Sequence, residues 1–144
     1  MITVKIQKIK DNAVVPSYAH KGDAGVDLYS TEDYVLSPGN KILVSTGIKI
    51  ALPIGYEAQV RPKSGLALKH GLSIVNTPGT IDAGYRGEVG VIVINHGQDE
   101  YKIEKGNKIA QMVFNKIEEV NFEESGDLDD TSRGEGGFGS TTLK

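Results

Sequence analysis

The chain has 144 residues, a net charge of −3 and no cysteine. This length predicts a single domain. The absence of cysteine excludes disulfides and thiolate metal sites, and the negative charge argues against a general nucleic-acid binder, which needs a basic face. Three scattered histidines show no ligand spacing, so any metal is expected to be bound by oxygen atoms.

Short β-rich runs separated by turn formers dominate the chain. Apolar and polar residues alternate over residues 2–6, and further runs follow at residues 41–52, 56–61, 72–76, 88–95, 100–103 and 108–117. Residues 66–70 alone have a helical pattern, and Ser64 is the expected N-cap of that turn. The pattern predicts an all-β domain, a distorted jelly-roll barrel or sandwich with one short helix and a flexible C-terminal arm.

The run from Val89 to Ile94 lacks a polar face, although antiparallel strands of a small monomer normally alternate apolar and polar residues. A central position in a sandwich would cover both faces, and so would a subunit interface. We favour an oligomer.

The C-terminal end differs from the rest in composition. Residues 118–130 contain seven acidic residues and no basic one, and four glycines follow between residues 134 and 139. Such a segment cannot bury enough apolar surface to order itself. The sequence therefore predicts a β jelly-roll core over residues 1–120, an acidic flexible linker over 121–132 and a glycine-rich arm over 133–144 that orders against a ligand or another subunit.

The N-terminal sequence has neither a secretory leader nor an Arg-rich amphipathic segment, and no apolar run approaches the length of a membrane span. We expect a soluble, cytoplasmic protein with no membrane or nucleic-acid partner.

Residues 79–88 place Asp82, Tyr85 and Arg86 among glycines. An acid and an aromatic ring on a backbone that can approach a ligand closely suggest a small-molecule site. The alternative is a structural hairpin whose Asp82 satisfies its own turn amides and whose Tyr85 caps the core. These residues alone leave both interpretations open.

Four more segments combine polar residues with glycine, which gives five in all: residues 24–28, 61–67, 79–88, 106–112 and 133–141. In this order they resemble the five motifs of the trimeric dUTPase family. The resemblance implies hydrolysis of dUTP to dUMP and pyrophosphate with Mg²⁺, which keeps uracil out of DNA and supplies dUMP for thymidylate synthesis. It also implies a homotrimer of jelly-roll subunits whose active sites are shared between chains.

The family's nucleoside site is expected around residues 76–90. Asp82 resembles the catalytic carboxylate that deprotonates the attacking water, and Tyr85 resembles the ring that excludes a ribose 2′-hydroxyl. Asn76 matches the uracil reader, because an amide both donates and accepts hydrogen bonds. The resemblance adds Thr80, Ile81 and Gly90 as substrate-binding positions.

The phosphate and metal site is expected from other motifs. Arg61, Lys63, Ser64 and Gly65 resemble the phosphate-binding group, with Ser64 and Gly65 at a helix start that favours anions. Many relatives carry Arg where this chain has Lys63, which replaces a forked donor by a point charge. Asp27 and Gln111 are expected around Mg²⁺ through its bound waters. Taken alone, Asp27 suits an Asx-type turn and Gln111 an outward-facing strand position.

Three residues of the arm complete the implied site. Arg133 resembles a clamp for the γ-phosphate, Phe138 a lid over the uracil ring, and Gly139 a position where the backbone wraps the substrate. Two other functions remain open: a dCTP deaminase relative, whose family lacks such an arm, and a non-catalytic nucleotide-sensing regulator on the same scaffold.

Overall fold

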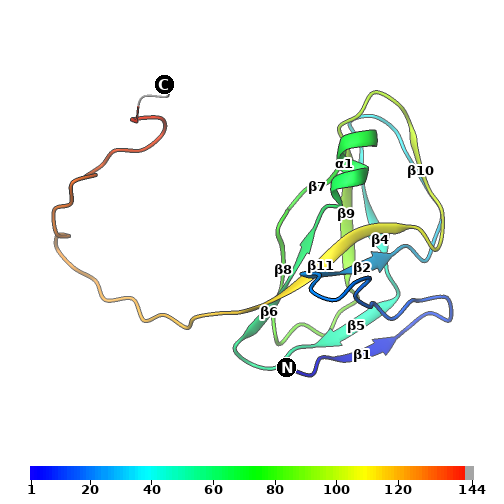
Figure 1. Cartoon of the computed structure of the whole chain (residues 1–144), viewed down its shortest axis with the longest axis horizontal. Helices are drawn as coiled ribbons and strands as arrows, with labels where there is room; N and C mark the ends of the chain where they lie inside the picture. The colour runs from blue at the N-terminus through cyan, green and yellow to red at the C-terminus, as the bar shows by residue number, and fades with distance from the viewer. Residues whose placement is uncertain (142–144) are drawn as a thin grey trace.

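The computed structural model describes residues 1–141, which form β-strands and one short helix (Figure 1). The strands are β1 (Lys5–Lys8), β2 (Gly25–Tyr29), β3 (Tyr34–Leu36), β4 (Lys41–Ser45), β5 (Ile48–Ala51), β6 (Tyr56–Arg61), β7 (Leu72–Ile74), β8 (Gly79–Ile81), β9 (Gly90–Asn95), β10 (Tyr101–Ile103) and β11 (Lys108–Lys116). The helix is α1 (Ser64–His70). The predicted all-β class with one short helix is confirmed.

The strands form four antiparallel groups. The largest sheet has the order β2-β11-β6-β8, the second has the order β4-β9-β7, and β1-β5 and β10-β3 are two-stranded. Most neighbours in a sheet are distant in sequence, as in a jelly roll. Within residues 1–141 none of these sheets closes into a barrel.

The core lies between the sheets and is made of aliphatic side chains. Leu28, Val44, Ala58 and Val91 are fully buried within it. They come from β2, β4, β6 and β9, so each larger sheet contributes one face to the core. The other face of the β4-β9-β7 sheet is less completely buried.

Strand β9 shows this two-sided character. Val91 and Val93 are buried, whereas Ile92 and Ile94 on the other face are only partly covered. Leu43 on the adjacent strand β4 is 64% exposed. One chain therefore covers one face of this apolar run and leaves the other partly open.

Several predicted boundaries were wrong. The run at residues 41–52 is two strands, because Gly47 has φ +68° and the position of a Cβ there would lie 2.9 Å from Ala13. Helix α1 begins at Ser64, so the N-cap is Lys63, which makes no side-chain capping bond. Gly71 ends the helix in the left-handed region, and its N–H donates to the carbonyl of Ala67.

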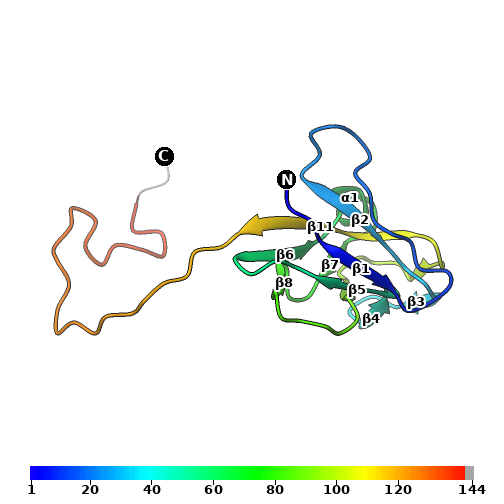
Figure 2. The ribbon, with the colours of Figure 1, turned by 90° about the horizontal axis from the view of Figure 1, so that it is seen from below.

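Beyond β11 the chain has no helix or strand up to residue 141, and most of its side chains are exposed. Figures 1 and 2 show this segment, orange to red, leading away from the body of the subunit. The remaining residues of the predicted arm, 142–144, lie outside the described part. Within residues 1–141 there is no helix with the length and hydrophobicity that crossing a membrane requires.

Candidate active site

A row of three polar side chains crosses the largest sheet. Asp27 on β2 lies opposite Gln111 on β11, which in turn lies opposite Arg61 on β6. Directly paired residues of neighbouring strands point to the same face, so this register brings the three side chains together. We call this set the Asp27–Gln111–Arg61 row.

Gln111 is fixed in the middle of the row. Its Nε2 donates to the carbonyl of Pro62 at 2.9 Å. Its Oε1 lies 2.8 Å from where a Cβ of Gly25 would be, so the absence of a side chain at residue 25 makes room for the amide. The glycine of the first predicted motif therefore has a steric role here.

Asp27 is almost buried and bound by two lysines. Lys63 Nζ donates to one carboxylate oxygen, and Lys108 Nζ lies 2.8 Å from the other. Burial disfavours the charged carboxylate, but the hydrogen bonds from Lys108 and Lys63 and their positive charges outweigh burial, so the pKa of Asp27 is below its ordinary value. The hydrogen bond with Asp27 likewise raises the pKa of Lys108.

We expect this ion-paired cluster to make the stability of the protein sensitive to acid. The pKa of Asp27 is lower in the folded chain than the ordinary value of 3.8, so its stabilising contribution is complete above that value and is lost as the pH falls through the folded pKa. Urea unfolding near neutral pH and in acid should show a steeper loss of stability for wild type than for Asp27→Asn.

The exposed Asp129→Asn is a suitable control, because its side chain lies on the segment beyond β11. It should follow the wild-type dependence. If Asp27→Asn also followed the wild-type dependence, the assigned role of the lysines would be contradicted.

The start of α1 lies next to this cluster in sequence. Ser64 and Gly65 are both exposed, and a Cβ at Gly65 would meet open space. The first N–H groups of a helix have no partner within the helix. The exposed start of α1 follows directly after Lys63, which contacts Asp27.

The second group of predicted residues surrounds β8. Asn76 precedes the strand, and its amide nitrogen lies 3.2 Å from where a Cβ of Gly79 would be. Thr80 is exposed and Ile81 is buried. Asp82 follows directly and is exposed.

Tyr85 follows in the turn between β8 and β9. Its side chain is 46% exposed, and its hydroxyl donates to the carbonyl of Glu88 at 3.0 Å. A Cβ at Gly87 would lie 2.3 Å from that hydroxyl, so the Tyr85 side chain occupies this space. With Leu43, Gly90 and others, Tyr85 lines a pocket of about 360 Å³. Tyr85 is therefore not a core-capping residue in this chain.

The two groups lie apart within one chain. In the pairing of β6 with β8, Gly79 lies opposite Val60 and Ile81 lies opposite Ala58. Asp82 therefore follows β8 at the end of β6 away from Arg61, roughly 10 Å or more along the strand. The described chain does not bring Asp82 next to the Asp27–Gln111–Arg61 row.

The predicted arm residues are separate from both groups. Arg133 is exposed, and its Nε donates to the carbonyl of Gly136 at 2.8 Å. Phe138 is fully exposed and has φ +49°, in the left-handed region, next to Gly139. In Figures 1 and 2 this part of the chain lies away from the sheets.

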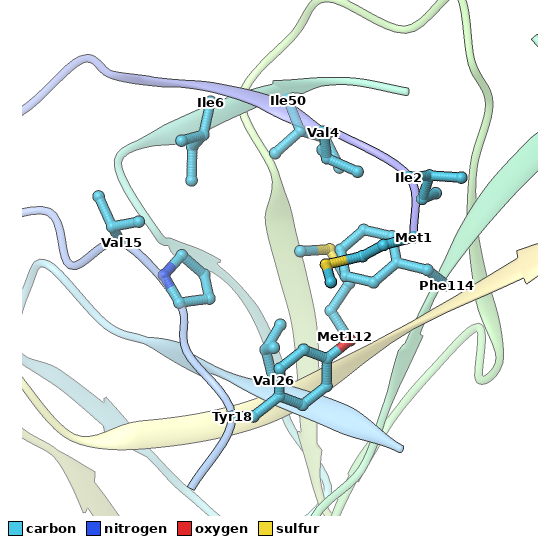
Figure 3. A pocket seen from close by; sticks show the side chains of 11 residues that line it. Met1, Ile2, Val4, Ile6, Val15, Tyr18, Val26, Ile50, Met112 and Phe114 are labelled. Atoms are coloured by element: carbon cyan, nitrogen blue, oxygen red, sulfur yellow. The ribbon is translucent and has the colours of Figure 1, made fainter. Parts of the chain in front are cut away.

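A different pocket, shown in Figure 3, has a volume of about 330 Å³. It lies between the N-terminal segment and strands β2, β5 and β11, and most of its lining is apolar: Met1, Ile2, Val4, Ile6, Val15, Pro16, Tyr18, Val26, Ile50, Met112 and Phe114. This lining does not suit a charged ligand, so we assign the candidate site to the polar groups above.

Sequence reasoning missed two charged residues at these sites. Lys108 lies within a predicted motif but was assigned no role, and Glu88 ends the Tyr85 turn. A charged residue on a strand or in a turn is usually solvated. The register places Lys108 opposite Tyr29, and the structure shows that its ammonium group reaches Asp27. The partners of Glu88 are Ser45, at the end of β4, and Gly47, in the connection that follows, both more than forty residues earlier in the chain.

Comparison with known proteins decides the family. The dUTPase family model matches residues 11–142. The chain belongs to the dUTPase family. A relative from Clostridioides difficile named deoxyuridine 5′-triphosphate nucleotidohydrolase is 57% identical over 141 residues, which is 98% of this chain and 99% of the relative. One of the same name from Alkaliphilus metalliredigens is 56% identical over the full length of both chains.

Solved structures agree with this assignment. The dUTPase of Staphylococcus bacteriophage 80alpha with dUPNHPP has a TM-score of 0.92 at 30% identity and covers 99% of this chain and 100% of its own. A mutant dUTPase from phage phi11 of S. aureus, described for its coordination of a structural Mg(II) ion, has a TM-score of 0.83 at 27% identity, over 88% of this chain and 99% of its own. The jelly-roll fold expected from the sequence is that of these neighbours.

Proposed function

We propose that this dUTPase family member hydrolyses dUTP to dUMP and pyrophosphate. The observation that carries the proposal is the family match over nearly the whole chain, together with an exposed Asp82 and Tyr85 on one turn. Relatives more than half identical in sequence are named for this reaction.

Asp82 is the proposed general base. Its exposed carboxylate removes a proton from a water molecule, and that water attacks the α-phosphorus in line with the leaving pyrophosphate. Tyr85 occupies the space next to the sugar, where a 2′-hydroxyl would collide with the ring. Asn76 donates and accepts hydrogen bonds along the uracil edge, with Thr80, Ile81 and Gly90 lining the same nucleoside site.

The triphosphate is proposed to bind at the Asp27–Gln111–Arg61 row and the start of α1. Arg61, Lys63 and Lys108 supply positive charge, and Ser64 and Gly65 supply backbone N–H groups. If one of the two lysines moved from Asp27 to a phosphate oxygen, Asp27 would still be paired with the other lysine, so every charge would remain paired.

Mg²⁺ fits this site only together with the substrate. Residues 1–141 contain no group of three or more acidic or histidine side chains that could hold a metal, and Asp27 is the one carboxylate in the row. Mg²⁺ typically takes one or two carboxylates and completes its shell with water and phosphate. Asp27 and Gln111 would hold it through water. When bound, the ion neutralises charge on the triphosphate.

We propose a homotrimer with shared active sites. Support comes from the separation of Asp82 from the Asp27–Gln111–Arg61 row within one chain and from the partly open apolar face of β9. Val120 and Phe122 on the segment after β11 are 65% and 92% exposed, which fits a segment that packs on another copy. Arg133, Phe138 and Gly139 would then close over a neighbour's nucleotide.

The alternatives are less favoured. The dCTP deaminase family lacks the glycine-rich arm that this chain carries, and the named relatives are dUTP hydrolases. A non-catalytic regulator would not need Asp82 and Arg133, and both are present.

The direct test is pyrophosphate release with Mg²⁺ from dUTP, UTP, dCTP and dTTP, measured in parallel. We expect release from dUTP and near-background release from the other three, because each differs at the sugar or at the base edge. Comparable release from UTP or dTTP would contradict the assigned specificity. Deamination of dCTP would support the rival enzyme.

A further inference from the structure

The turn that carries Asp82 and Tyr85 is held to the core at one end by a carboxylate. Within the turn, Tyr85 N–H donates to the carbonyl of Asp82 at 3.1 Å, and the Tyr85 hydroxyl donates to the carbonyl of Glu88. These bonds shape the turn but do not attach it to anything else. Strand β8 and the partly buried Ala83 attach the first end of the turn, and residues 88 and 89 attach its last end.

Glu88 makes this attachment through its side chain. Its Oε1 accepts a hydrogen bond from Gly47 N–H at 2.9 Å and another from the Ser45 hydroxyl. The next residue, Val89, is buried and donates its N–H to the carbonyl of Ile48 at 2.8 Å. The connection between β4 and β5 thus serves as a fixed platform for the turn.

This platform has little freedom to move. Gly47 is buried, and a side chain there would lie 2.9 Å from both Ala13 and Thr31. Interiors packed this closely transmit displacement instead of absorbing it. An amide held in this way is a rigid donor for Glu88.

A chain of charges extends from Glu88 on the other side of Ser45. The Ser45 hydroxyl accepts from Lys10 Nζ at 2.8 Å, and Lys10 also pairs with Glu32 at 2.6 Å. Tyr34 donates to Glu32 at 2.9 Å and accepts from Ser45 N–H at 3.1 Å. The hydrogen bond with Glu32 and the charges of Glu32 and Glu88 raise the pKa of Lys10. The Lys10 ammonium group therefore contacts Glu32 directly and is linked to Glu88 through the Ser45 hydroxyl.

We propose that Glu88 is a positioning residue that sets how strictly the enzyme rejects ribonucleotides, an inference that rests on the function proposed above. Its side chain fixes the C-terminal end of the turn, and its own carbonyl receives the Tyr85 hydroxyl. Both the height of the ring above the sugar and its tilt therefore depend on where Glu88 is held. A ring displaced by about 1 Å would admit a 2′-hydroxyl, and misplacement of this size can change rates about 10²-fold.

The test compares Glu88→Ala and Glu88→Gln with wild type. For each we would measure kcat/KM for dUTP and for UTP, and hydrogen exchange of peptides covering residues 82–89. In Glu88→Ala the ratio of kcat/KM for dUTP over UTP should fall by about tenfold or more, and the turn should exchange faster. Glu88→Gln keeps an oxygen acceptor and should remain within about threefold of wild type.

Two further variants serve as a control and as a second test. Glu104→Ala removes an exposed carboxylate elsewhere and should leave both measurements unchanged. Ser45→Ala removes one of the two donors to Glu88. It should lower the dUTP-to-UTP ratio of kcat/KM and speed hydrogen exchange of the turn, each by less than Glu88→Ala does. This variant keeps the proposal testable if Glu88→Ala does not fold.

If hydrogen exchange of residues 82–89 were unchanged in the folded Glu88→Ala variant, Glu88 would not hold the turn and the proposal would be wrong. If hydrogen exchange became faster but the ratio of kcat/KM for dUTP over UTP did not change, Glu88 would hold the turn without setting the position of the Tyr85 ring, and the proposed role in specificity would be wrong. A wild-type chain with no preference for dUTP would overturn the proposed function, and the exchange measurement would still decide whether Glu88 holds the turn.

Discussion

Asp82→Asn is expected to lower kcat for dUTP hydrolysis by about 10²- to 10⁴-fold, the usual contribution of a positioned general base. Asparagine has nearly the same shape as aspartate but cannot accept a proton from the attacking water. Asp82 is exposed at the end of β8 and is not part of the core. Stability and dUTP binding should therefore stay close to wild type. Single-turnover rates and a binding isotherm for dUPNHPP would measure both.

A matched control is Asp99→Asn, which changes another exposed aspartate in a connection, between β9 and β10. It should keep wild-type kcat. An Asp82→Asn enzyme with unchanged kcat would remove Asp82 from the mechanism, whereas loss of binding alone would give it a role in holding the sugar.

Deleting residues 131–144 is expected to leave a folded oligomer whose kcat/KM for dUTP falls by about 10²-fold or more. The deletion removes Arg133 and Phe138, and none of the described residues it removes, 131–141, belongs to the hydrophobic core. Closing segments exclude water and complete a catalytic constellation, so their loss reduces turnover more than folding. Thermal unfolding, light scattering and pyrophosphate release would separate these effects.

Point variants sharpen this result. Arg133→Ala should weaken triphosphate binding, because it removes a forked cationic donor. Phe138→Ala should act through the loss of an aromatic face over the base. Asp129→Ala, in the acidic stretch before the arm, is the control and should behave as wild type. Full turnover by the truncated chain would contradict a closing role for the arm.

The sequence predicted strands best where turn formers bound them on both sides. Strand β6 has its predicted limits, because Pro53, Gly55 and Pro62 surround a β-rich run. Strands β2, β3 and β8 were not predicted as strands. Two of them, β2 and β8, lie in glycine-rich motifs that are typical of turns. Their partners are β11 and β6, and pairing with those strands overrides the local preference.

Residues of the candidate site could be proposed one by one from the sequence, but their arrangement could not. The resemblance to the dUTPase motifs implied roles for Asp27, Gln111 and Arg61, and the register places these three together. The roles of Lys108 and Glu88 were not predicted, because the residues they contact are far away in sequence. The resemblance implied sites shared between chains, but the distance of Asp82 from the Asp27–Gln111–Arg61 row depends on which end of β6 meets β8, and only the structure shows that.

The placement of Asp82 and Arg61 at opposite ends of β6 has a consequence for the life of the enzyme. In the proposed trimer, a newly made subunit that has finished folding is still inert, since it contains only fragments of three different catalytic centres. Catalytic activity would begin only when three subunits assemble, so the amount of active enzyme would depend on the rate of assembly as well as on synthesis. Proteolysis or dilution that separates the copies would silence hydrolysis without unfolding a single chain.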